Sequence, residues 1–129
     1  MSYRAIYTYA WDLAEAGVPN AAAQFRDLGL DTVTIAGSYH AGKFLRPHGT
    51  SGKVYFPEDG TVYFRPEAKR YGRIKPVENS LNAAHDFFAE LTTAGLPVNA
   101  WMVLLHNTRL GAAYPDVTGQ QAEDWLGAA

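Results

Sequence analysis

Residues 31–48, DTVTIAGSYHAGKFLRPH, contain the apolar segment that decides the fold, and a cluster of polar side chains follows it directly. The segment 32–36 is mostly β-branched and lies between Asp31 and Gly37, which is typical of a buried strand covered on both faces in a parallel sheet. Ligands bind α/β proteins in the crevice outside the carboxyl ends of such strands. We therefore expect this strand to deliver the side chains after Gly37 to a site.

Two further segments have the pattern of strands, and helical patterns separate the three. Residues 4–10 alternate and are rich in Tyr, and residues 98–105 are almost continuously apolar, which favours a strand buried on both faces. Residues 20–28 and 81–94 carry apolar side chains at helical spacing, and each helix ends in Gly-Leu before a strand. Residues 14–20 are expected to be a turn. This β-α-β-α-β order predicts an α/β fold with a parallel sheet whose strands end at one edge.

Residues 41–78 interrupt this rhythm with four prolines and five glycines, so we interpret them as an inserted loop. Within it, residues 53–64, KVYFPEDGTVYF, place two apolar segments around Pro57–Gly60, which predicts a β-hairpin. Turn chemistry accounts for Glu58 and Asp59. Because the hairpin follows the polar strand end, we expect it to lie across that end as a cover.

The composition is that of an ordinary globular domain, with 47% hydrophobic and 19% charged residues. The absence of cysteine excludes disulfides and thiolate metal sites. No apolar segment approaches the roughly 20 residues that span a bilayer, so we expect a cytoplasmic protein without a membrane partner. The net charge of −2 and the lack of a reader motif argue against nucleic acid. Residues 43–75 carry eight basic and three acidic side chains, a local excess that could attract an anion.

The 129 residues, 1–129, are expected to form a single domain. Three parallel strands with two helices leave a sheet edge open and apolar surface uncovered, so we expect this domain to be an incomplete part of a larger α/β protein. A short amphipathic helix is predicted around residues 120–126. The oligomeric state is left open.

Polar and aromatic side chains follow all three predicted strands. They are Trp11 and Asp12, then Ser38, Tyr39 and His40, and finally His106, Asn107 and Arg109. A carboxylate, two imidazoles and an amide at one edge favour general acid–base chemistry or hydrogen bonding to a polyol over metal binding. The candidate catalytic residues are Asp12, His40 and His106, and the candidate substrate-binding residues are Trp11, Tyr39, Lys43, Arg46, His48, Asn107 and Arg109. We assign no metal ligand and no cofactor.

Each candidate also has a purely structural interpretation. The aromatic rings could belong to the core or its rim, and Asp12 could cap the turn after its strand. Lys43 and Arg46 could be solvated loop residues. His85 is expected on a helix, away from the strand ends. The sequence contains no phosphate loop, nucleophile elbow, HExxH or GxGxxG motif.

Four segments resemble the opening third of bacterial (β/α)8-barrel proteins described as glycoside-hydrolase-like. They are WDL at 11–13, SYHAGKFLRPHG at 38–49, VYFPEDG at 54–60 and LLHNTRLG at 104–111. The resemblance covers about residues 3–118 and implies that Asp12, His40 and His106 line the barrel mouth. Glycosidases generally need two carboxylic acids at the scissile bond, and only Asp12 is a well-placed carboxylate here. The resemblance therefore implies a carbohydrate-binding wall without a complete catalytic pair.

Three hypotheses about function follow. The first is part of a carbohydrate-active, hydrolase-like barrel that binds a sugar or polyol at the strand ends. The second is a sugar isomerase or epimerase barrel, in which the histidines and later carboxylates would hold a divalent metal. The third is a non-catalytic ligand-binding or structural fragment.

Overall fold

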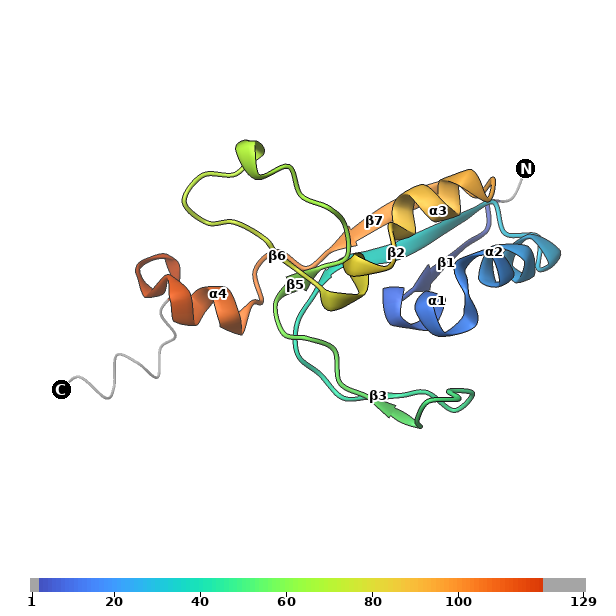
Figure 1. Cartoon of the computed structure of the whole chain (residues 1–129), viewed down its shortest axis with the longest axis horizontal. Helices are drawn as coiled ribbons and strands as arrows, with labels where there is room; N and C mark the ends of the chain where they lie inside the picture. Colours follow the sequence, from blue (N-terminus) through green and yellow to red (C-terminus); the bar gives the residue numbers. More distant parts are fainter. Residues whose placement is uncertain (1–2, 120–129) are drawn as a thin grey trace.

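Three parallel strands form the centre of the molecule (Figure 1). The computed structural model describes residues 3–119, so the helix expected at 120–126 lies outside the described part. Strand β2 (Thr32–Tyr39) lies between β1 (Ala5–Thr8) and β7 (Val98–Met102), and its Val33 pairs with Ile6 on one side and Val98 on the other. The predicted α/β fold with a mostly parallel sheet is confirmed, and the three strands end at one edge.

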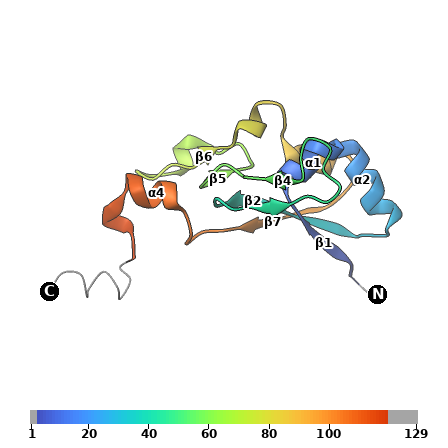
Figure 2. The ribbon, with the colours of Figure 1, turned by 90° about the horizontal axis from the view of Figure 1, so that it is seen from below.

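Three helices lie on one face of this sheet (Figure 2). They are α1 (Ala10–Ala16), α2 (Val18–Asp27) and α3 (Phe87–Thr93). Val33 and Ile35 of β2 are fully buried in one cluster with Leu13, Phe87 and Leu91. Burying a side chain of this size stabilises the fold by about 1.5–3 kcal/mol, so this face holds the hydrophobic core.

Two helix predictions need correction. The segment AWDLAEA, at residues 10–16, is helical because Ala, Leu and Glu are strong helix formers, so α1 replaces the turn expected at 14–20 and the strand expected to reach Ala10. Gly17, with φ of +79°, then separates α1 from α2. The helix expected at 81–94 is divided into a 3₁₀ turn, η2 (Ser80–Ala83), and α3, because Asp86 caps α3 by accepting a hydrogen bond from the Ala89 amide at 3.2 Å.

The hairpin predicted at residues 53–64 is wrong. Strand β4 (Val54–Tyr55) pairs with β3 (Phe44–Leu45), whereas β5 (Thr61–Val62) pairs with β2 and with β6 (Val77–Glu78). Ser38 of β2 pairs with both Met102 and Val62, so β5 occupies the edge opposite β7, beyond the end of β1. Thr61 and Val62 are almost completely buried where β5 pairs with the free edge of β2. An exposed ribbon of β4 and β5 would leave these two side chains in contact with water.

Strand β7 is shorter and more exposed than its apolar sequence predicts. It ends at Met102, all five of its residues are half-buried or exposed, and the side chain of Leu104 beyond it is 76% exposed. The reason is that α3 covers one face of β7, and among residues 3–119 no strand pairs with its outer edge. The remaining short elements are η1 (Ala68–Arg70), α4 (Thr108–Ala113) and η3 (Pro115–Val117).

Candidate functional site

Two histidines meet at the carboxyl edge of the sheet. His40 directly follows β2 and His106 lies four residues beyond β7, and their ring centroids are 4.5 Å apart at an angle of 61°. His40 is half-buried and His106 is exposed. The parallel arrangement of β2 and β7 is what brings these residues together across 66 positions of sequence, as the strand-end argument predicted.

The surroundings of His40 determine which ring nitrogen is available. Its Nδ1 lies 2.6 Å from the carbonyl oxygen of Ala41, and a carbonyl oxygen only accepts, so the neutral ring carries its hydrogen on Nδ1. The lone pair on Nε2 is therefore left for a hydroxyl donor. The Ala41 amide in turn donates to Asp59 Oδ1 at 2.9 Å, so Asp59 holds the backbone next to the carbonyl that His40 contacts. Turn chemistry alone did not suggest this role.

An aromatic surface leads from the histidines along the face of the sheet without helices. The pairing of β2 with β7 shifts between Ala36 and Ser38, and this bulge brings Tyr39 against Trp101, with ring centroids 5.4 Å apart. Trp101 also contacts Tyr7 edge to face at 5.6 Å. These two rings line a pocket of about 340 Å³, and Tyr7 is 71% exposed.

Neither Tyr7 nor Trp101 was a sequence candidate. Strand alternation could have identified Trp101, because Asn99 and Trp101 point to one face of β7 while Val98, Ala100 and Met102 point to the other. The continuous apolar character of the segment concealed that alternation. Asn99 lies on the same open face, where its amide donates to the Tyr3 hydroxyl at 3.3 Å and to Thr32 Oγ1 at 3.4 Å.

Trp11 is part of the core. It lies in the first turn of α1 and not at a strand end, and it is only 3% exposed. Tyr9 stacks on its ring at 4.3 Å and Tyr55 at 5.0 Å, so both neighbours cover surfaces that a sugar would need. Phe44 of the β3–β4 hairpin also contacts it, at 5.3 Å. The β3–β4 hairpin therefore packs against Trp11 of α1, and the cover expected from a hairpin of residues 53–64 does not form.

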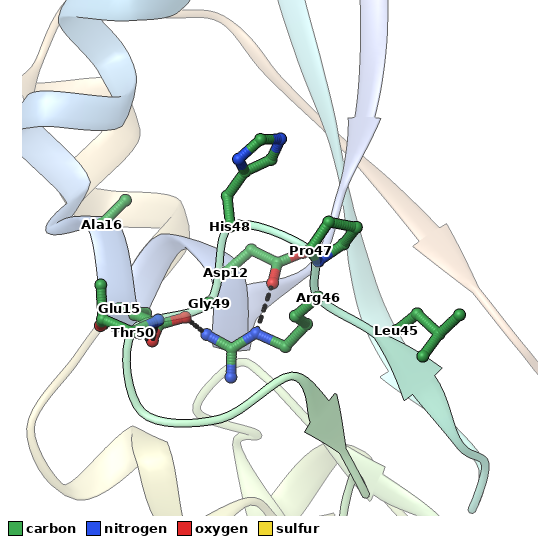
Figure 3. A pocket seen from close by; sticks show the side chains of 9 residues that line it. All are labelled: Asp12, Glu15, Ala16, Leu45, Arg46, Pro47, His48, Gly49 and Thr50. Carbon is green, nitrogen blue, oxygen red and sulfur yellow. Dashed lines mark hydrogen bonds and ion pairs between the residues drawn. The ribbon is translucent and has the colours of Figure 1, made fainter.

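Asp12 and Arg46 belong to a second, ionic pocket (Figure 3). Arg46 has a side chain only 8% exposed, and its Nε lies 3.3 Å from Asp12 Oδ1 while its Nη2 is ion-paired with Glu15. Its guanidinium also lies over the ring of Tyr55, 5.3 Å from the centroid. Burial raises the pKa of the Asp12 carboxyl above its ordinary value, and Arg46 opposes this shift.

Glu15 is the residue of this pocket that the sequence did not reveal. Its Oε1 accepts four hydrogen bonds, from the amides and hydroxyls of Thr50 and Ser51, at 2.7–3.0 Å. Asp12 and Glu15 are spaced three apart on one face of α1, a pattern that becomes meaningful only once residues 10–16 are known to be helical. The pocket has a volume of about 370 Å³, and His48 lines it with its ring directed away from the Arg46 guanidinium.

The remaining candidates lie outside both clusters. Lys43 and Arg109 are exposed. Asn107 caps α4 by accepting from the Leu110 amide at 2.9 Å, and its side-chain amide donates to the Gly60 carbonyl at 3.2 Å. His85 lies between η2 and α3, not on a helix as expected, with its Nδ1 3.2 Å from Glu90 Oε1.

Residues 3–119 contain neither a candidate metal site nor a helix that could span a membrane. In this part of the chain, no three histidine, aspartate or glutamate side chains come close enough together to hold a metal ion. None of its helices combines the length and the apolar character needed to cross a membrane.

Comparisons with known proteins leave the family open. The chain matches no family model, and no similar protein was found among curated proteins or solved structures. Any assignment of activity therefore rests on the residues and their geometry.

Proposed function

We propose that the protein binds a sugar or polyol at the carboxyl edge of its sheet, as part of a (β/α)8-barrel of the carbohydrate-active, hydrolase-like kind. The arrangement of β1, β2 and β7 supports the barrel. These strands neighbour one another in chain order, run parallel and carry their helices on one face, as do consecutive strands of a barrel wall. The uncovered face with Tyr7 and Trp101 would then be the barrel interior.

The observation that carries the ligand proposal is the pair of histidines beside a partly exposed aromatic surface. A sugar has apolar C–H faces that pack on aromatic rings and hydroxyl groups that need directed hydrogen bonds. Trp101 and Tyr7 offer the rings, and His40 Nε2 offers an acceptor held in place by Ala41. His106, 4.5 Å away ring to ring, can contact a neighbouring hydroxyl group.

The geometry favours binding over hydrolysis by these residues alone. Glycoside hydrolysis generally uses two carboxylates on either side of the bond. Within residues 3–119 neither His40 nor His106 is paired with a carboxylate, and Asp12 is held by Arg46 in the other pocket. The hydrolase-like activity would thus need carboxylates that approach this edge from elsewhere.

A titration with a panel of hexoses, pentoses and sugar alcohols tests this proposal, with binding followed by calorimetry and by amide chemical shifts. We expect Trp101→Ala, His40→Ala and His106→Ala each to lower affinity about tenfold or more, because each removes a central contact. The matched controls are Phe56→Ala, which removes an exposed ring elsewhere, and His85→Ala.

The melting temperature of each variant separates binding from folding. Unchanged affinity in the three site variants, or no binding of any sugar by the folded wild-type chain, would contradict the proposal. Binding that depends on an added divalent metal ion would instead favour the isomerase or epimerase hypothesis.

A further inference from the structure

A third pocket, distinct from the carbohydrate and ionic sites, lies beyond the end of β7. It has a volume of about 220 Å³ and is formed by side chains of β5, the segment 65–76, the end of β7, and α4. The lining is mainly apolar and includes Val62, Ile74, Pro76, Met102, Leu104 and Leu110. Figure 1 shows that the segment 65–76 and α4 both extend past the end of the sheet.

Two polar side chains that line the pocket, those of Ser38 and Asn107, are already used within the chain. Ser38 Oγ donates to the Val103 carbonyl at 2.9 Å and accepts from the Val103 amide at 2.8 Å. The Asn107 side chain is engaged with Leu110 and Gly60. A molecule in this pocket would therefore be held by contacts with its apolar body.

Contacts between residues outside the lining support the outer wall of the pocket. The Arg73 guanidinium makes two hydrogen bonds to the carboxylate of Asp116 and lies 5.2 Å from the ring centroid of Tyr114. The Tyr114 hydroxyl donates to the Arg73 carbonyl at 3.3 Å. Lys75 Nζ donates to the carbonyl of Tyr71, a lining residue, at 3.4 Å. A preformed apolar pocket is the usual starting point for binding a small molecule.

Two chain segments that contribute lining residues to the pocket, which we call the basic rim, carry a net positive charge in a protein of net negative charge. The segments 65–76 and 106–118 contain six basic and two acidic residues, a local charge of +4 against −2 for the whole chain. Arg70 directly precedes the lining residue Tyr71 and is 73% exposed, and Arg109 directly precedes Leu110. Arg70 and Lys69 share the single carboxylate of Glu67, so their charges are only half compensated. Such a rim raises the local concentration of anions.

We propose that this pocket binds a small amphipathic anion, an alkyl or aryl carboxylate, with its apolar body among Leu110, Ile74 and Met102 and its carboxylate in the field of the basic rim. The size of the pocket limits the apolar body to about six carbon atoms or one aromatic ring. This site is independent of the histidine edge, and neither proposal needs the other.

Hexanoate and hexanol are the probes, because they share an apolar chain and differ in charge. The chain contains only two methionines, so ¹³C-methyl labelling gives a signal from Met102 inside the pocket wall and one from Met1. We expect hexanoate to shift the Met102 signal with millimolar affinity, as its small size implies, and to bind about tenfold more tightly than hexanol at low salt. Added salt should weaken the binding of hexanoate and leave the binding of hexanol unchanged.

Two pairs of variants locate the two parts of the site. Leu110→Asp should abolish the Met102 shift, whereas Leu28→Asp, at an exposed position directly after α2 and away from the pocket, should not. Arg70→Glu should lower the affinity for hexanoate about three- to tenfold. Arg4→Glu, which breaks a similar surface ion pair, should leave this affinity unchanged. Circular dichroism checks that Leu110→Asp is folded, and Arg70→Glu carries the test if it is not. Equal binding of hexanoate and hexanol, or no Met102 shift with either at about 50 mM, would overturn the proposal.

Discussion

The ion pair between Arg46 and Glu15 should contribute much more to stability than an exposed pair. It joins the β3–β4 hairpin to α1, and the side chains are 8% and 19% exposed. The perturbation is a double-mutant cycle with Arg46→Met and Glu15→Gln. Gln keeps an oxygen for Thr50 and Ser51, and Met keeps the apolar length of the arginine.

The expected size of the coupling follows from the burial of the two groups. Removing one partner of a fully buried pair costs about 3–5 kcal/mol, largely because the other charge is left unpaired. Asp12 stays close to Arg46 and is 45% exposed, and Glu15 retains its four donors, so we expect a coupling of about 2 kcal/mol. Each single variant should lower the melting temperature by roughly 8 °C for a chain of this size.

Urea denaturation followed by circular dichroism gives the four free energies of unfolding. The matched control is the same cycle on Arg4 and Asp31, whose side chains are 58% and 47% exposed. Exposed pairs contribute about 0.2–1 kcal/mol, so the control coupling should be clearly smaller. If the two cycles gave the same coupling, the reasoning that the hairpin is anchored through a buried charge would be refuted.

Three further predictions concern single residues. Gly60→Ala should destabilise the fold by about 1–3 kcal/mol in urea denaturation, because Gly60 has φ of +62° and a Cβ there would collide with Asn107, whereas Gly72→Ala, in open space, should be neutral. Phe87→Ala should lower the free energy of unfolding by about 3–5 kcal/mol in the same assay, because the Phe87 ring is fully buried. If this loss were no greater than that of Phe56→Ala, at a 67% exposed position, the core would be misassigned. Burial raises the pKa of Asp12, so the folded state binds the carboxyl proton more tightly than the unfolded chain does. The free energy of unfolding of the wild type, relative to that of Asp12→Asn, should therefore fall as the pH rises above about 3.8. Urea midpoints measure this difference, and an increase with rising pH would contradict the raised pKa of Asp12.

The strand order and the meeting of His40 with His106 could be predicted because both rest on short-range signals. A β-branched run, helical spacing and a Gly-Leu stop each involve neighbouring residues, and right-handed crossovers then leave few choices for the sheet. Pairing of the short strands in residues 41–78 follows a different rule. β4 and β5 flank a good turn, yet β5 pairs with β2 because an unoccupied edge lies there.

The sequence by itself determined that the chain forms helices between parallel strands and that two histidines follow strand ends. Only the tertiary structure decided that Trp11 is in the core, that Glu15 and Asp12 hold Arg46, and that Trp101 and Tyr7 form the open aromatic surface. The physical reason is that periodicity is a property of neighbouring residues. The burial of a ring, the partner of a charge and the free edge of a strand depend on segments distant in the chain that compete for the same surface.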